Sequence, residues 1–435
     1  MTAYLSMLRN MPGKMLIASL ALAAAFPVAA QSPYPTSFDA GIVSRVDVRR
    51  ALGWLDANFD RQVGEWVHIA EMQGQSGHEA ARGAFVRRAM EAEGLIVSVD
   101  SIGNVIGRRP GTGGGPTTVF AAHLDIVHPI GTDLKVRRKG DTLHAPGIFD
   151  NSASVANMLA VIRALNQAKL RTRGDLIFIG TAQEELGLKG MAYWLDHAPR
   201  RPDMLVAMDG GLGPINYGAL GIYWTRYFFR GEGAHTVRST GQPHPAKALA
   251  EAIRSIYELR VPEGQGGAVY NVGMLDGGKI FNGIPQEVSF TMDLRSVNPV
   301  LLDSLNREIE TRVARAAERE RVRWAKEEVL RNGAGGTETM LASRRAHPLV
   351  QTAIDIHRHL GIDIGETGAT ATGSTDANVG VVRGIPSISV GRSRGGNQHT
   401  LSEWADVPSA LSATKMILLL ALSLANSGEP AAPVP

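Results

Sequence analysis

The sequence predicts an α/β protein with a mixed sheet and a second, inserted α+β unit. Between residues 96 and 218, apolar strand-like runs alternate with helical runs, a pattern typical of a sheet covered by helices. After Tyr217 the order changes to β-α-β-β-α-β, which is the order of a ferredoxin-like unit. We therefore expect one α/β domain in two pieces, 31–218 and 334–435, around an inserted domain at 219–333.

The first 30 residues have the pattern of a signal peptide. Arg9 and Lys14 precede an apolar run, residues 15–30, that ends in small residues, so we expect cleavage after Ala30. An uncleaved anchor is the less favoured alternative, because this run is short for a bilayer and no other stretch is expected to approach the necessary length. The mature protein is expected to be exported, periplasmic or secreted, and free of the membrane.

Charge and cysteine content limit the partners and the metal ligands. The formal net charge is +3, and residues 1–30 contain two basic residues and no acid, so the mature chain carries +1 (3 minus 2). This balance gives no electrostatic reason to expect nucleic acid as a partner. The chain has no cysteine, so a transition-metal site would have to be built from His, Asp and Glu.

The first piece of the α/β domain should begin with two helices. Residues 46–72 and 79–94 carry apolar side chains at helical spacing. Strands at 97–110 and 117–127 then flank the sequence GTGGGP, residues 111–116, which we expect to be a hairpin loop. A hairpin at 135–144, a glycine turn and a long apolar helix follow, and the strand beginning at Asp175 leads into the next helix.

The inserted unit and the second piece are predicted in the same way. In the insert we expect strands at 221–235, 268–278, 287–297 and 322–330, with helices at 246–259 and 301–320. A helix at 347–361, a strand at 385–391 and an apolar helix at 409–425 return the chain to the α/β domain. The final residues are expected to be a loose tail.

Acids and imidazoles cluster where the expected strands end or helices begin. His123 and Asp125 lie two apart at the end of a strand, so their side chains point the same way. Taken singly, such residues are more often helix caps, solvated charges or structural hydrogen-bond partners than metal ligands. Together they supply two imidazoles and three carboxylates, the donors that a pair of hydrolytic metal ions such as zinc needs. The five positions are His123, Asp150, Glu185, Asp209 and His399.

The order of these motifs resembles the M20 family of zinc metallopeptidases over almost all of the mature chain. That family holds tripeptide aminopeptidases, glutamate carboxypeptidases, aminoacylases and acetylornithine and succinyl-diaminopimelate deacylases. The resemblance implies a zinc-exopeptidase-like domain with an inserted lid or dimerisation domain. It is carried by HLD at 123–125, APGIFDN at 145–151, the glutamate pair at 184–185, AMDGG at 207–211, GEGAHT at 231–236, the segment 271–285, DLRS at 293–296, GSTDAN at 373–378 and GNQHT at 396–400.

By this resemblance, the centre holds two zinc ions per subunit, which cobalt or manganese can replace. Asp150 would bridge the two ions. His123 and Asp209 would complete one site, and Glu185 and His399 would complete the other.

The resemblance also implies the catalytic roles. Asp125 would orient His123, and Glu184 would take a proton from the metal-bound water and return it to the leaving amine. His235, in the lid, would stabilise the oxyanion, and in dimeric members of the family it comes from the partner subunit. The chain is accordingly expected to form a homodimer through the lid.

Four further residues are candidates for binding substrate. Asn282 and Arg295 could grip a substrate carboxylate, although a structural ion pair is an equal alternative for Arg295. Ser374 and Thr375 belong to the segment GSTDAN, which matches a substrate-side loop of the family.

Two departures from the family pattern bear on the substrate. Thr236 stands where serine is usual, which keeps the hydroxyl. Asp209 stands where many deacylases and carboxypeptidases have glutamate but tripeptidase-like members have aspartate, and this favours short peptides. We therefore predict an exopeptidase, with a deacylase of N-acyl amino acids or a carboxypeptidase of the same family as the alternative.

Two rival interpretations come from other classes. The segment GRSRG at 391–395 matches the G-x-S-x-G string of serine hydrolases, but no helical pattern follows it, and the last histidine, His399, precedes every later acid. A metal-free binding or dimerisation module would be expected to have lost ligands or the base, and none is missing. Both interpretations are disfavoured.

Overall fold

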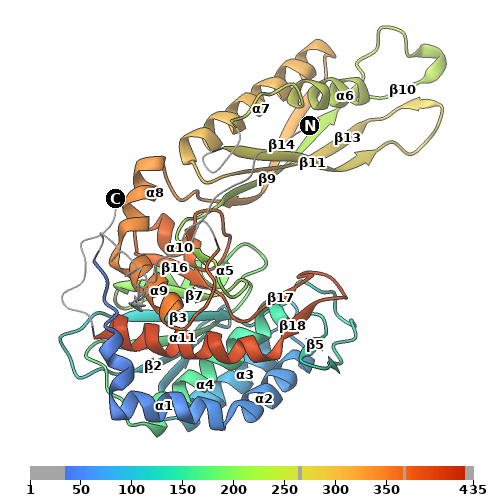
Figure 1. Ribbon diagram of the computed structural model, residues 1–435. Helices are drawn as coiled ribbons and strands as arrows, with labels where there is room; N and C mark the ends of the chain where they lie inside the picture. Colours follow the sequence, from blue (N-terminus) through green and yellow to red (C-terminus); the bar gives the residue numbers. More distant parts are fainter. Residues whose placement is uncertain (1–34, 263–266, 366–368, 427–435) are drawn as a thin grey trace, which may run out of the picture. The chain divides into compact units, whose positions relative to one another are not determined.

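The computed structural model describes residues 35–262, 267–365 and 369–426 (Figure 1). The predicted signal peptide and the end of the C-terminal tail lie outside these ranges. The predicted α/β class is confirmed by an eight-stranded mixed sheet with the strand order β1-β2-β6-β3-β7-β16-β8-β15. Its strands are β1 (Ile96–Val99), β2 (Val105–Arg109), β3 (Thr118–His123), β6 (Leu176–Thr181), β7 (Met204–Met208), β8 (Ile215–Asn216), β15 (Ala369–Thr370) and β16 (Ser387–Val390).

The centre of this sheet is parallel, and the margin formed by β1 and β2 is antiparallel. β3 runs parallel to both β6 and β7, and β7 runs parallel to β16. β2 pairs antiparallel with β1 and with β6, not with β3. The prediction that GTGGGP closes a hairpin was therefore wrong, because β6 lies between the two strands that this loop joins.

Both faces of the sheet are covered by helices. Along β3, Phe120 and Ala122 pack in one core cluster, whereas Val119 and Ala121 pack in another, as the two-residue period of a strand requires. The first cluster lies under α1, α2, α4 and α11, and the second under α5 and α10 (Figure 1). The helices of this domain are α1 (Val46–Ala57), α2 (Phe59–Glu71), α3 (Ala80–Ala92), α4 (Ala153–Gln167), α5 (Lys189–His197), α8 (Glu338–Ala346), α9 (Pro348–His359), α10 (Ala377–Val382) and α11 (Val407–Ala425).

Helix α11 corrects the expectation that no stretch beyond the N-terminal run is long enough for a membrane. It has 19 residues and is apolar enough to cross a bilayer, the one such helix among the residues that the structure describes. Its side chains are buried in the core beside α4 and α9, from Met416 to Ala425 without a break. The apolar run therefore belongs to the core of the domain.

A small four-stranded sheet lies beside the end of the domain that carries the site. Its strand order is β17-β18-β5-β4, and β18 pairs antiparallel with β5. The predicted hairpin at 135–144 forms β4 and β5. The strands are β4 (Arg137–Lys139), β5 (Thr142–His144), β17 (Gly395–Gly396) and β18 (Trp404–Asp406).

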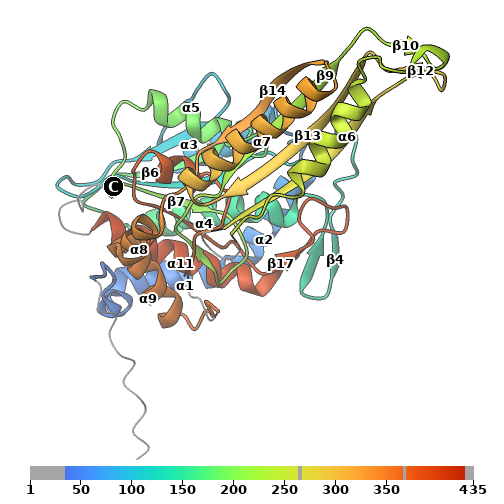
Figure 2. The same ribbon diagram turned by 90° about the horizontal axis from the view of Figure 1, so that it is seen from above.

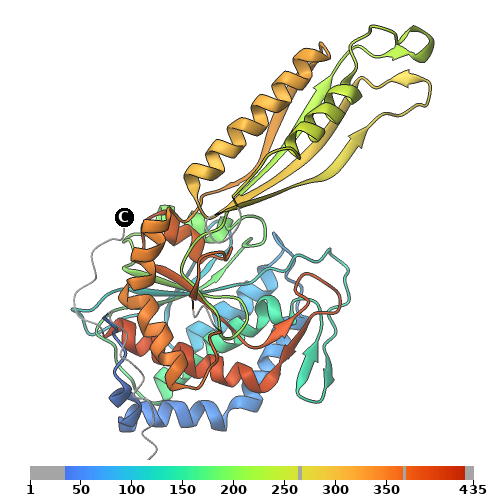
Figure 3. The ribbon, with the colours of Figure 1, turned by 45° about the horizontal axis from the view of Figure 1, so that its top comes forward.

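A separate antiparallel sheet is built from residues within the range predicted for the insert. Its strand order, β11-β13-β9-β14, is that of a ferredoxin-like unit, and α6 and α7 pack side by side on one of its faces (Figures 2 and 3). Helix α7 begins where Asn298 accepts hydrogen bonds from the backbone N–H groups of Val300 and Leu301. The elements are β9 (Gly221–Arg230), β10 (Ala234–His235), α6 (Pro245–Ile256), β11 (Ala268–Gly277), β12 (Gly283–Ile284), β13 (Glu287–Ser296), α7 (Pro299–Arg319) and β14 (Arg323–Asn332).

Candidate active site

Three neighbouring parallel strands deliver polar side chains to one edge of the large sheet. β3 ends at His123, β6 ends just before Glu184 and Glu185, and β7 ends just before Asp209. Because β6, β3 and β7 are adjacent and parallel, their carboxyl ends meet at this edge. Such an edge is where α/β sheets generally place their sites.

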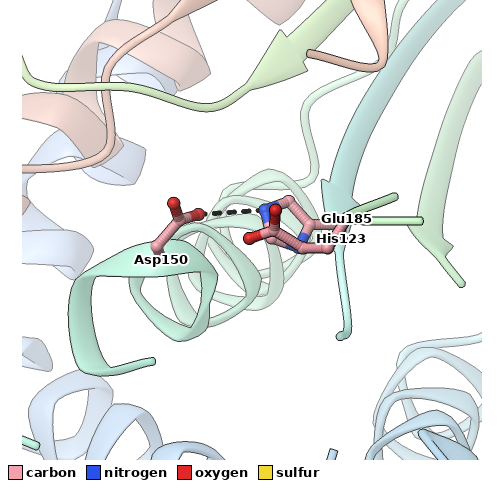
Figure 4. Close-up of side chains that lie close together, drawn as sticks. All are labelled: His123, Asp150 and Glu185. Atoms are coloured by element: carbon pink, nitrogen blue, oxygen red, sulfur yellow. Dashed lines mark hydrogen bonds and ion pairs between the residues drawn. The ribbon is translucent and has the colours of Figure 1, made fainter. Parts of the chain in front are cut away.

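The first half of the cluster is built on His123, which is 2% exposed. Its Nε2 lies 3.0 Å from Oδ1 of Asp150 and 3.8 Å from Oδ2 of Asp209. Asp150 comes from the short turn η2 (Ile148–Ser152) before α4. Figure 4 shows Asp150 and the imidazole of His123 facing one another, with Glu185 beside them.

The second half is built on His399, whose side chain is about half exposed. Its Nε2 lies 3.0 Å from Oε1 of Glu185 and 3.5 Å from Oδ2 of Asp150. Asp150 thus faces one imidazole with each of its two carboxylate oxygens. The structure therefore brings all five predicted ligand positions together, with Asp150 between the two halves.

This donor set suits divalent metal ions. Ligand atoms of His123, Asp150 and Glu185 all lie within 4.8 Å of one another, close enough to share one ion. Two imidazoles and three carboxylates, without thiolate, are donors that zinc and similar hydrolytic metals accept. The residues at this edge therefore fit a metal centre with Asp150 in the shared position.

Asp125 does more than the sequence predicted. It is fully buried, and it accepts hydrogen bonds from the hydroxyl of Ser76 and from the backbone N–H groups of Glu184 and Glu185. Nδ1 of His123 lies 3.0 Å from the backbone carbonyl of Asp125 and 3.4 Å from its carboxylate. Asp125 therefore positions the glutamate loop as well as the imidazole, and the imidazole's nearer partner is the carbonyl.

Glu184 is buried beside the cluster with its side chain 6% exposed. Burial raises the pKa of its carboxyl well above the usual value, and Asp209, Asp376 and Glu185 add to this effect against the opposing charge of His123. A carboxyl with a raised pKa accepts a proton more readily than an exposed glutamate. This property suits a general base at the edge of a metal cluster.

The imidazoles and the shared aspartate are electrostatically coupled. Burial alone would lower the pKa of His123, but Glu184, Asp125 and Asp150 together raise it well above the usual value. Hydrogen bonds to Asp150 and Glu185 raise the pKa of His399 to about 10. In the metal-free protein both rings therefore hold protons that an ion must displace.

Two buried residues of the site were not predicted from the sequence. Arg392 is 1% exposed, and its guanidinium contacts both Asp150 and Asp209. Glu403, also 1% exposed, accepts hydrogen bonds from the backbone N–H groups of Gly147, Phe149 and Asp150, and so holds the turn that carries the shared aspartate. The available signal was a charged residue inside an otherwise apolar or glycine-rich segment beside His399.

The other predicted site residues lie outside this cluster. His235 is on β10 of the inserted unit, where its Nε2 lies 3.4 Å from Nδ2 of Asn282, and both side chains are exposed. Arg295 donates to Asp293 at 2.8 to 3.1 Å, which is the structural ion pair weighed as its alternative role.

The segment GSTDAN divides into an exposed and a buried part. Ser374 is exposed, whereas Thr375 is buried and its hydroxyl accepts from the backbone N–H of Ala377. Asp376 is 3% exposed, accepts from the hydroxyl of Thr181, and has its pKa raised to about 7 by burial. Thr375 therefore stabilises its own turn.

The serine-hydrolase interpretation finds no support in the surroundings of Ser393. This serine is fully buried and is followed by the strand β17, not by a helix. A nucleophile elbow needs an exposed hydroxyl on a strand-to-helix turn.

Comparison with known proteins identifies the family to which the chain is similar. Residues 119–423 match the family model described as peptidase family M20/M25/M40. Carboxypeptidase G2 from Pseudomonas sp. (strain RS-16) is 23% identical over 332 residues, which are 75% of this chain and 76% of that protein.

Solved structures share the fold over nearly their whole length. A tripeptidase from Staphylococcus aureus subsp. aureus mu50 superimposes with a TM-score of 0.70 at 19% identity, covering 85% of this chain and 99% of that one. The Bacillus subtilis YXEP protein, described as a dinuclear metal binding peptidase, superimposes with a TM-score of 0.62 at 16% identity, covering 84% of this chain and 98% of that one. At these identities the likeness shows the fold alone.

Proposed function

The chain belongs to peptidase family M20/M25/M40, whose members hydrolyse amide bonds, and from that premise we propose that it is an exopeptidase acting on short peptides with two zinc ions. The observation that carries this proposal is the meeting of five ligand positions around Asp150, with the buried carboxyl of Glu184 beside them. The amide-hydrolase assignment is the family's, while the metal identity and the substrate are proposed.

The ligands divide into two sets that share one aspartate. His123 and Asp209 would hold one ion, Glu185 and His399 the other, and Asp150 both. Zinc bound there would supply a Lewis acid and lower the pKa of a water molecule.

The chain's own residues would move the proton and fix the geometry. Glu184 would accept a proton from water and deliver it to the leaving amine, a role that its raised pKa supports. Asp125 holds the backbone of Glu184 and Glu185, so adjacent glutamates can face different partners. This preorganisation keeps the base and the ligand in place before substrate arrives.

The preference for peptides rests on one ligand position and one structural neighbour. Asp209 is the aspartate found in tripeptidase-like members, and a tripeptidase shares the fold. The alternative is hydrolysis of N-acyl amino acids or removal of C-terminal residues, which the similarity to carboxypeptidase G2 favours. Both alternatives use the same metal and base residues.

The inserted unit is proposed to join two subunits and to supply His235 to the partner's site. β11 is an edge strand of the inserted sheet, and its side chains Val269, Met274 and Leu275 are all more than half exposed. An uncovered edge strand with apolar side chains is suited to pairing with another chain. Export is proposed from the signal-peptide pattern alone.

A panel of peptides tests the substrate assignment. Purified protein would be assayed on di- and tripeptides, each offered free, blocked at the amine and blocked at the carboxylate. We expect turnover of the free peptides, and a requirement for the free amine would identify an aminopeptidase. Dependence on a free carboxylate, or preference for N-acetylated substrates, would instead favour the carboxypeptidase or deacylase alternative. Measuring the N-terminus of the secreted protein would test export and the cut after Ala30.

A further inference from the structure

The guanidinium of Arg392 is a fixed, buried cation inside the cluster of carboxylates. Its backbone N–H donates to the carbonyl of Gly210, and its carbonyl accepts from the side chain of Asn157. The guanidinium lies over the ring of Phe149, 4.1 Å from the ring centroid, and donates to Oδ1 of Asn151 at 3.2 Å. Backbone and side chain are thus held from several elements, so the charge has a defined position.

The guanidinium of Arg392 contacts carboxylate oxygens in the half of the cluster that contains His123. Nη2 lies 3.1 Å from Oδ1 of Asp150, the same oxygen that faces His123, and Nη1 donates to Oδ1 of Asp209. The second oxygen of Asp209 is left facing His123. His399, in contrast, faces Oδ2 of Asp150 and contacts Glu185, and no contact between either His399 or Glu185 and Arg392 is present among the described residues.

Two consequences follow from the fixed charge. In the absence of metal, Arg392 balances Asp150 and Asp209, two carboxylates with side chains only 13% exposed that would otherwise repel one another. When an ion is present, the same guanidinium repels it, and a divalent ion feels twice the repulsion of a singly charged one. Both effects act on the half that contains His123.

We propose that Arg392 is a positioning residue that stabilises the metal-free centre and makes the ion at His123 and Asp209 the more weakly bound of the two. This inference rests on the proposed two-metal function. It predicts that the centre fills in a fixed order, with the ion at Glu185 and His399 bound first. When the charge is removed, we expect the lost repulsion to tighten binding of this ion more than the lost support of Asp150 and Asp209 weakens it.

Zinc titration of the full chain, freed of metal and competed with a chelator of known affinity, tests the proposal. The wild type should show two affinities separated by at least about tenfold. Asp209→Asn should keep the tighter site, and Glu185→Gln should keep the weaker one. The two variants together assign each affinity to one half of the cluster. Equal affinities in the wild type, or the opposite assignment, would overturn the proposal.

Arg392→Met should bring the two affinities together by tightening the weaker site about tenfold, while lowering the melting temperature of the metal-free protein. Arg392→Lys, which keeps the charge, should leave the order of filling intact. Arg163→Met is the matched control, because Arg163 is also a buried arginine paired with a carboxylate, Glu65, outside the cluster. It should lower the melting temperature without changing either zinc affinity.

The results distinguish failure of the Arg392 proposal from failure of the proposed two-metal function. If Arg392→Met weakens the first-half site or leaves it unchanged, Arg392 does not repel the ion and the proposal falls. If Arg392→Met does not fold, Arg392→Gln provides the same comparison with a polar side chain. If the wild type binds no zinc and is active without metal, the proposed two-metal function fails, whatever the arginine variants do.

Discussion

The large sheet and the inserted sheet differ in how their strands are covered. Every residue of β3, β7 and β16 is buried, so both faces of those strands are packed. Along β9 and β14 of the inserted sheet, buried or half-buried residues mix with exposed ones, and helices cover only one face. The first sheet is the interior of a domain, whereas the second keeps one face open.

The functional side chains differ in the same way. His123, Asp125 and Glu184 are buried, and each is held by several hydrogen bonds or neighbouring charges. His235 is exposed, and among the described residues its side-chain hydrogen-bond partner is Asn282. The difference teaches that the candidate metal-binding edge is preformed within one chain, while the imidazole of the insert has no comparable set of partners among the described residues.

Metal removal should have the largest effect and should act on the buried edge alone. Exhaustive chelation should reduce turnover below detection, and zinc, cobalt or manganese should restore it, because an ion both polarises the carbonyl and activates water. Turnover and metal content would be measured together. Full activity in metal-free protein would contradict the model of a preformed metal centre.

Separating the two adjacent glutamates tests how finely the buried edge is organised. Glu184→Gln should lower kcat by roughly 10²- to 10⁴-fold while metal content and melting temperature stay near normal, since only the proton acceptor is lost. Glu185→Gln should instead lower metal occupancy and melting temperature together, because metal bound to the folded state stabilises it. If the two variants exchange these behaviours, the roles are assigned backwards.

Variants of the exposed His235 test whether a residue of the insert takes part in catalysis. His235→Ala should lower kcat by roughly 10²-fold, the usual cost of removing one oxyanion donor, with little change in metal content. Mixing His235→Ala with Glu184→Ala under conditions that exchange subunits should restore part of the activity, because a mixed dimer holds one intact site. Proven exchange without recovery would mean that His235 serves its own subunit or has no role in catalysis.

The smallest effect concerns protons on the more exposed half of the cluster. The pKa of His399 is raised from 6.5 to about 10, so the stability that its ion pairs give the metal-free protein is fully present below pH 6.5 and is lost as pH rises through about 10. Zinc must displace this proton, so zinc affinity should rise by up to roughly tenfold per pH unit for this group at pH values below about 10. Titrations at pH 6, 7 and 8 would show it, and an affinity independent of pH would refute it.

The meeting of His123, Glu185 and Asp209 could be predicted because its cause is local, whereas Asp150 and His399 lie outside these three strands and were placed with them by the resemblance to the M20 family. A strand end followed by His, Glu or Asp is visible in the sequence, and parallel strands bring their ends to one edge without further information. Arg392 and Glu403 could not be found in that way, because their partners lie far along the chain, Asp209 for one and the turn at 147–150 for the other.

Errors in the predicted fold have the same origin. GTGGGP looked like a hairpin because its flanking strands are consecutive, but β6, which follows much later, lies between them. The length and apolar composition of helix α11 are visible in the sequence, but its burial in the core beside α4 becomes known only when the distant pieces meet. Local pattern determines which elements form, while strand order and buried charge pairs depend on the whole chain.

The hydrogen bonds that Glu403 accepts from the turn carrying Asp150 affect when the site can form during synthesis of the chain. This glutamate lies four residues beyond His399, so the last ligand and the residue that holds the shared aspartate both come from the end of the α/β domain. A nascent chain that has emerged only as far as the insert possesses His123, Asp150 and Glu185 but lacks the three hydrogen bonds that Glu403 accepts from the turn. The candidate centre can therefore gain its full set of contacts only after residues 399 to 403 have been synthesised.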